Sequence, residues 1–216
     1  MTSADEAQDA DSGAQTARIV ALSDGVFAIA MTLLVLTLTV PHLTEPNIAA
    51  RLPAALLGTW RHTLSYVISF LVIGIYWRAH RVIFQYIKRS DAGLEWLNLI
   101  FLMTVAYLPF PTAVLGAYGD ARPAVVFYAL SLATTSFLDL LIWTHASAGH
   151  RLVARDLDAR TIVRLRLDAL APTAVFLLSI PISLISVGAA EASWALLSWL
   201  VGAGVARFMP LRSSSQ

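Results

Sequence analysis

Long stretches without a charged side chain are the feature that most limits how this chain can fold. A helix needs about 20 apolar residues to cross the roughly 30 Å hydrocarbon core of a bilayer. Six runs without Asp, Glu, Lys or Arg, the fourth interrupted only by Asp139, lie at 25–44, 62–77, 96–119, 123–150, 169–190 and 192–206. Only 13% of the residues are charged, against about 25% in soluble domains. The sequence therefore predicts an all-α integral membrane protein with six transmembrane helices.

The segments outside these runs complete the predicted organisation. Residues 1–16 contain four acidic residues and no Lys or Arg, and we expect a disordered acidic leader. Residues 17–209 form the six-helix transmembrane domain, and 210–216 form a polar tail. Proline cannot donate an interior helical hydrogen bond. Pro41 is therefore expected to close the first helix, and kinks are expected at the prolines of the third and fifth helices, Pro109, Pro111, Pro172 and Pro181.

The basic residues segregate in a way that predicts the orientation. Membrane proteins carry an excess of Lys and Arg on the cytoplasmic side. With six spans, three of the 15 basic residues fall on one side, namely Arg51, Arg61 and Arg122, and the other 12 fall on the opposite side. We therefore expect a multi-pass protein of the inner or plasma membrane of the cell, with both termini in the cytoplasm.

Polar residues near the cytoplasmic ends of the first three helices need partners, because charge and polarity are costly at membrane depth. Arg18 and Asp24 are six residues apart and so do not share a helical face. Arg18 either reaches interfacial water or bonds to another helix, and for Asp24 a buried partner is expected. Together with His80 and Asn98, these residues could form one bonded cluster.

The uncharged part of the first helix carries a stripe of small, bulky and hydroxyl side chains. Gly25, Ile29, Thr32 and Leu36 recur at i, i+4, i+7 and i+11, with Leu33 beside them. Ordinary helix packing in membranes also uses small and branched residues at such spacings. Thr32 could also bond to the carbonyl one turn earlier. Periodicity alone therefore does not assign a function to this stripe.

Three motifs in order resemble a known family. The first is Arg18-x-x-x-Leu22-Ser23-Asp24 and the helix that follows it, the second is Trp77-x-x-His80-x-x-x-Phe84, and the third is the Leu-Asn-Leu stretch around Asn98 with Leu108-Pro109-Phe110. Over about residues 18–115 they resemble the lysosomal potassium channel family, transmembrane protein 175, in its prokaryotic form. That family typically has Phe where this chain has Leu22, so we expect the side-chain packing behind this motif to differ from that of the family.

The resemblance implies a potassium channel of modest selectivity, built as a homotetramer with the first helix of each subunit around a central pore. The family lacks the usual filter, and this chain has no Thr-Val-Gly-Tyr-Gly segment. By resemblance, Ile29 forms a hydrophobic gate, Leu33 and Leu36 continue the pore lining, and Thr32 supplies potassium preference. The family's inner hydrogen-bond network maps onto Arg18, Ser23, Asp24, Trp77, His80 and Asn98.

Other functional classes have weaker support. A proton-coupled secondary transporter is the alternative, resting on His80 and on Asp139 and Asp168, although both carboxylates also fit an interfacial position beside arginines. No Gly-x-Ser-x-Gly, His-Glu-x-x-His or paired catalytic carboxylates are present, so no enzyme is expected. We expect no cofactor and no metal site beyond the permeant potassium ion. The net charge of +1 gives no sign of a nucleic-acid partner. Membrane lipid and other copies of the chain are the expected partners.

Overall fold

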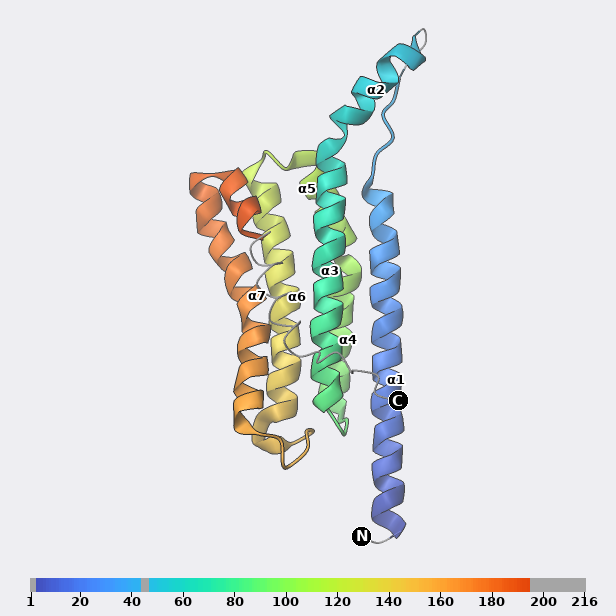
Figure 1. Ribbon diagram of the computed structural model, residues 1–216, viewed down its shortest axis with the longest axis vertical. Coiled ribbons are helices and arrows are strands. Elements are labelled where there is room, and N and C mark those ends of the chain that lie inside the picture. Colours follow the sequence, from blue (N-terminus) through green and yellow to red (C-terminus); the bar gives the residue numbers. More distant parts are fainter. Residues whose placement is uncertain (1–2, 44–46, 195–216) are drawn as a thin grey trace, which may run out of the picture.

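The computed structural model describes residues 3–43 and 47–194, and nearly all of this part of the chain is helical (Figure 1). The helices, in chain order, are α1 (Ser3–Leu33), the 3-10 turn η1 (Leu34–Thr37), α2 (Ile48–Gly58), α3 (Trp60–Tyr86), α4 (Ala92–Tyr107), α5 (Pro109–Tyr118), α6 (Arg122–Ser147), the 3-10 turn η2 (Ala148–His150) and α7 (Ala159–Ile185). A further helical stretch covers 187–194.

Five segments of the described residues are long and apolar enough to span a membrane. They are Ser12–Thr37, Trp60–Tyr86, Ala92–Tyr118, Arg122–His150 and Ala159–Ile185. The protein is therefore an all-α integral membrane protein, as the uncharged runs predict. The expected sixth span, at 192–206, lies outside the described residues beyond Trp194, as does the expected polar tail at 210–216.

The helices form an elongated bundle in which α1 lies at one side and α7 at the other (Figure 1). Helix α6 packs against α7, α4 and α5, while α1 packs against α3 and α4. The core between them is apolar and includes Phe27, Ile73, Phe101, Tyr128 and Trp143. Helix α1 thus has neighbours within the subunit on one side only, and this leaves much of its surface uncovered.

The beginning of α1 differs from the expected disordered leader. The helix starts at Ser3 and runs without a break into the first span. The sequence of this segment explains the difference, because it is rich in alanine, the strongest helix former, and contains no proline. The segment also continues an existing helix, so it does not need to nucleate a new one.

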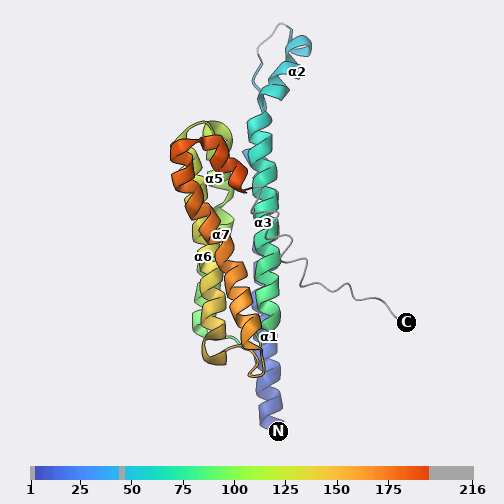
Figure 2. The ribbon, with the colours of Figure 1, turned by 60° about the vertical axis from the view of Figure 1, so that its left-hand side comes forward.

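The connection between the first two spans contains a helix that the charge pattern did not predict. Helix α2 is short and apolar, and none of its residues is buried within the subunit. It projects beyond the end of the bundle, and the turned view of Figure 2 shows the same separation.

The expected prolines act differently in the two helices that contain them. The third span is interrupted at Leu108, where α4 ends and α5 begins with Pro109, as expected for a residue that breaks the backbone ladder. In contrast, α7 contains Pro172 and Pro181 and remains one helix. The first helical segment ends at Thr37, four residues before Pro41.

Two loops meet at the end of the bundle opposite α2, which we call the basic end because they carry Lys88, Arg89, Arg151 and Arg155 beside the three acidic residues Asp91, Asp156 and Asp158. They are the turn between α3 and α4 and the 151–158 loop between α6 and α7, both at the lower end of Figure 1. Asp91 caps α4 by accepting a 2.8 Å hydrogen bond from the Leu94 amide. Its carboxylate also contacts His145 Nε2 at 2.9 Å and Arg151 Nε at 3.0 Å. The cap and the contacts with His145 and Arg151 tie these loops together.

These contacts set the pKa of Asp91. Partial burial raises the pKa of this carboxyl, but the Leu94 amide, His145 and Arg151 together outweigh burial, and the net pKa is lower than the usual 3.8. A lowered pKa in the folded protein means that the ionised carboxylate stabilises the fold. This contribution is complete above pH 3.8 and is lost as the pH falls through the lower value of the folded protein.

Two replacements of Asp91 should separate its cap from its charge. Asp91→Ala loses both, and we expect the protein to be destabilised by about 1–2 kcal/mol in thermal unfolding in detergent. Asp91→Asn keeps the cap and should be destabilised less. The difference between the wild type and Asp91→Asn should be present at pH 7 and shrink as the pH falls below 3.8. A pH-independent difference would contradict the assigned role of the charge.

Candidate functional site

Helix α1 has one face packed against other helices and an opposite face that no other part of the described chain, residues 3–43 and 47–194, covers. The packed face carries Ser23, Phe27, Ala30, Leu34 and Thr37, all buried, at alternating spacings of four and three residues. The exposed face carries, with the same spacing, Arg18, Leu22, Gly25, Ile29, Thr32 and Leu36. Every residue of the predicted stripe therefore lies on the unpartnered face, and Leu33 lies at its edge.

The chemistry of this exposed face varies along the helix. Ile29 and Leu36 are bulky and apolar, and 60% and 75% of their surfaces are exposed in the subunit. A Cβ atom at Gly25 would meet no atom within 4 Å. Thr32 donates its hydroxyl hydrogen to the Ile29 carbonyl at 2.8 Å. The Thr32 oxygen therefore keeps its lone pairs for a group on the open side of the helix.

A second site, the buried polar network, consists of Ser23, His80, Asn98 and Asp139. His80 Nδ1 lies 2.9 Å from the Asp139 carboxylate, and His80 Nε2 lies 3.3 Å from Ser23 Oγ. Asn98 Nδ2 donates to Ser23 Oγ at 3.2 Å. Ser23 lies on α1, His80 on α3, Asn98 on α4 and Asp139 on α6. The network therefore connects α1 to three other helices.

Aromatic rings surround the imidazole at the centre of this network. The His80 ring is stacked on Phe101 at 4.7 Å and lies 4.6 Å from Phe84 and 5.9 Å from Phe27. The rings exclude water, so the polar atoms of the network must satisfy one another. The Asp139 carboxyl pairs with Nδ1 of His80, which leaves Nε2 to pair with the Ser23 hydroxyl. The Ser23 hydroxyl also lies 2.9 Å from the Ile19 carbonyl.

Asp24 belongs to a separate pair and not to the network of its neighbour Ser23. Asp24 accepts a 2.7 Å hydrogen bond from the indole nitrogen of Trp77 on α3. The Arg81 guanidinium lies over the Trp77 ring, 5.2 Å from the ring centre. The expected partner of Asp24 on another helix is therefore found, but the single cluster expected from the sequence is two clusters. Consecutive helical residues point about 100° apart, which explains the division.

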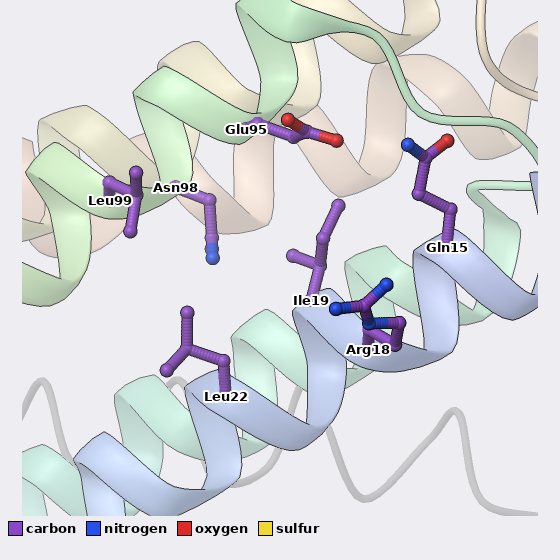
Figure 3. A pocket seen from close by; sticks show the side chains of 7 residues that line it. All are labelled: Gln15, Arg18, Ile19, Leu22, Glu95, Asn98 and Leu99. Atoms are coloured by element: carbon purple, nitrogen blue, oxygen red, sulfur yellow. The ribbon is translucent and has the colours of Figure 1, made fainter.

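Arg18 and Leu22 line a pocket of about 440 Å³ between α1 and α4 (Figure 3). Glu95 and Asn98 line its opposite wall, and the side chains of both walls point toward the space between them in Figure 3. Arg18 does not join the buried polar network in the subunit. Leu22, which stands where the family has Phe, is 49% exposed and does not pack behind the network.

The two acidic residues that supported the transporter alternative lie in different environments. Asp139 is 5% exposed and bonds to His80, so the expected interfacial position beside arginines is wrong for this residue. Its signal in the sequence was its position as the only charge inside the fourth uncharged run. Asp168 is exposed on α7. In the described part of the chain, no three His, Asp or Glu residues are grouped so that they could hold a metal ion.

A known protein family matches part of this chain. The model of the family described as endosomal/lysosomal potassium channel TMEM175 matches residues 18–109. These residues contain the exposed face of α1, the Asp24–Trp77 pair and three of the four members of the buried polar network; Asp139 lies beyond the matched segment.

The chain is also similar to individual bacterial proteins. It is 39% identical over 158 residues to a potassium channel of Streptomyces collinus, covering 70% of this chain and 75% of that protein. It is 34% identical over 183 residues to a potassium channel of Chamaesiphon minutus, covering 83% of this chain and 89% of that protein. Its structure resembles the crystal structure of a lysosomal potassium-selective channel TMEM175 homologue from Chamaesiphon minutus, with a TM-score of 0.78 and 30% identity over 89% of this chain and 98% of that chain.

Proposed function

Because this chain belongs to the endosomal/lysosomal potassium channel TMEM175 family, we propose that it is a potassium-preferring cation channel of the cell membrane. The channel is a homotetramer in which α1 of each subunit faces a central pore. The observation that carries this proposal is the unpartnered face of α1, where Gly25, Ile29, Thr32 and Leu36 form one continuous exposed stripe. The basic end of the bundle faces the cytoplasm, in line with the excess of positive charge there.

The composition of this stripe favours a pore over lipid contact. Arg18 continues the stripe at the basic end, and a charged group facing hydrocarbon is costly. Gly25 and Thr32 lie near the centre of the exposed face, where small and polar groups gain little from acyl chains. A water-filled pore accepts both kinds of group, and neighbouring subunits cover the flanks of the helix.

Ile29 is the proposed gate. Four isoleucine side chains around a narrow axis form an apolar ring, and such rings close a pore by excluding water. Leu33 and Leu36 continue the apolar lining away from the basic end. Because Ile29 is 60% exposed and lies outside the apolar core, a small rotation of α1 changes the width of the ring with little disturbance of the core.

Thr32 is the proposed source of ion preference. Its hydroxyl hydrogen is used by the Ile29 carbonyl, so four Thr32 oxygens can offer lone pairs to a cation just past the apolar ring. Neutral hydroxyl oxygens bind weakly, which fits a channel with modest selectivity and no carbonyl filter. The permeant potassium ion requires no cofactor.

Replacing Thr32 should test this assignment. We expect Thr32→Ala to reduce the preference for potassium over sodium, because it removes the oxygen ring, and Thr32→Ser to keep most of it. The reversal potential in mixed potassium and sodium solutions measures this preference. Equal selectivity in the wild type and Thr32→Ala would show that Thr32 does not select ions.

The function itself is tested by ion flux from proteoliposomes that contain the purified protein. Rapid, non-saturating loss of a potassium gradient, faster than loss of a sodium gradient, is the expected result. The proton-coupled transporter remains the second candidate, because His80 and Asp139 form a buried titratable pair of the kind that carriers use. Slow, saturating flux that depends on a proton gradient would favour the transporter and contradict the channel.

A further inference from the structure

A cavity at the basic end of the bundle has a strongly positive lining. Its volume is about 560 Å³, and its walls are Gly13, Lys88, Arg89, Val153, Ala154 and Arg155. Three of these six residues are cationic and none is acidic. Among the residues whose side chains the structure describes, 12–43 and 47–194, no carboxylate lies within ion-pair distance of Lys88, Arg89 or Arg155. The cavity thus gathers positive charge that this part of the subunit does not neutralise by ion pairing.

The frame of this cavity is fixed by backbone pairing. Ile87 and Val153 form an antiparallel bridge, and both are buried. The amides of Lys88 and Arg89 donate to the Leu152 carbonyl at 2.8 and 3.2 Å. The main chain is therefore held in place while the cationic side chains remain exposed. Such a rigid frame lowers the ordering cost of binding an anion.

The position of the cavity indicates where its ligand comes from. Gly13 lies one residue inside the first candidate span, Lys88 lies two residues beyond the second, and Arg155 lies five residues beyond the fourth. All three walls are therefore near the depth of the lipid headgroups. Basic pockets between membrane helices on the cytoplasmic side suit anionic headgroups.

We infer that this cavity binds the phosphodiester headgroup of an anionic phospholipid in the leaflet at the basic end. The Arg89 and Arg155 guanidinium groups come from the two paired loops and can each donate two hydrogen bonds to phosphate oxygens, while Lys88 supplies a third positive charge. Gly13 belongs to α1, so the bound lipid contacts the base of that helix together with the two loops. This binding does not require that the chain conduct ions.

The experiment uses the full-length protein in a neutral detergent and titrates it with short-chain dioctanoyl phosphatidylglycerol. Native mass spectrometry measures the half-saturating lipid concentration. Lys88→Gln/Arg89→Gln should raise this concentration about tenfold or more, because each lost charge-assisted contact weakens binding by roughly that factor. Arg155→Gln, which removes the cation of the 151–158 loop, should also raise the half-saturating lipid concentration. The matched control, Arg78→Gln/Arg160→Gln, removes the same charge from exposed positions outside the cavity and should change it less than twofold.

Three results would overturn the inference. The first is an equal loss in the control double variant, which would indicate general electrostatic attraction. The second is binding of dioctanoyl phosphatidylcholine as tight as that of phosphatidylglycerol. The third is competition by inorganic phosphate at the concentrations at which the lipid binds, which would identify a soluble anion as the ligand. The melting temperature of each variant verifies folding, and Arg155→Gln decides the outcome if the double variant is unfolded.

Discussion

Replacing Ile29 with alanine should open the pore and increase potassium flux by about tenfold or more. If four Ile29 side chains close the pore by excluding water, their removal widens the ring and lowers the barrier to ion entry. A barrier lower by about 1.4 kcal/mol corresponds to a tenfold faster rate. Ile29 is 60% exposed in the subunit, so the substitution leaves no cavity in the core and should not affect folding.

The measurement is potassium flux from proteoliposomes with equal amounts of wild type and Ile29→Ala. Leu178→Ala is a matched control, because Leu178 is 62% exposed and lies on α7, at the far side of the bundle from α1. The control should conduct like the wild type. If Ile29→Ala forms normal tetramers and its flux is unchanged, Ile29 is not the gate.

Removing the carboxylate of Asp139 should cause the largest loss of stability among single replacements in the buried polar network. Asp139→Ala leaves the Nδ1 group of His80 without its acceptor in a pocket closed by aromatic rings. Leaving a buried hydrogen-bond donor without its acceptor typically costs about 1–3 kcal/mol. We therefore expect a loss of about 2–3 kcal/mol and a clearly lower melting temperature in detergent.

Two further variants test whether the loss comes from the unsatisfied partner. His80→Phe/Asp139→Leu replaces both members by apolar groups, and it should be more stable than Asp139→Ala although it has two substitutions. Ser23 can then donate to the Ile19 carbonyl, which already lies within 2.9 Å. Asp120→Ala is the control for losing an exposed carboxylate: Asp120 pairs with Arg61 and is 81% exposed, so its loss should cost less than about 1 kcal/mol. If Asp139→Ala is as mild as Asp120→Ala, the pair does not stabilise the fold.

The features of the fold that depend on local sequence could be predicted well. Each of the first five uncharged runs overlaps one span, because the bilayer excludes charge along its hydrocarbon core. The third and fourth spans match their runs to within four residues, whereas the first, second and fifth spans differ from theirs by 9 to 13 residues at one end. The uncharged runs do not predict helix α2, because it is too short to span a membrane and contains Arg51. The helical beginning of α1 follows from its alanine content, which its acidic composition does not indicate.

The candidate site was only partly predictable from the sequence. The stripe with Ile29 and Thr32 follows from helical periodicity, but periodicity does not tell which face of a helix is buried. That choice depends on the packing of α1 against α3 and α4. The structure shows Ser23 and Phe27 on the packed side and Ile29 and Thr32 on the open side.

The sequence alone therefore determined that the chain is a helical membrane protein, where along the chain its first five spans lie and where its basic residues gather. These properties follow from the energy of each segment in the bilayer. The tertiary structure decided which polar groups pair. Ser23 and Asp24 are adjacent in the chain, yet Ser23 bonds to His80 and Asn98 while Asp24 bonds to Trp77, and His80 pairs with Asp139, 59 residues away. Such pairings depend on the angle and register between helices, which no single segment specifies.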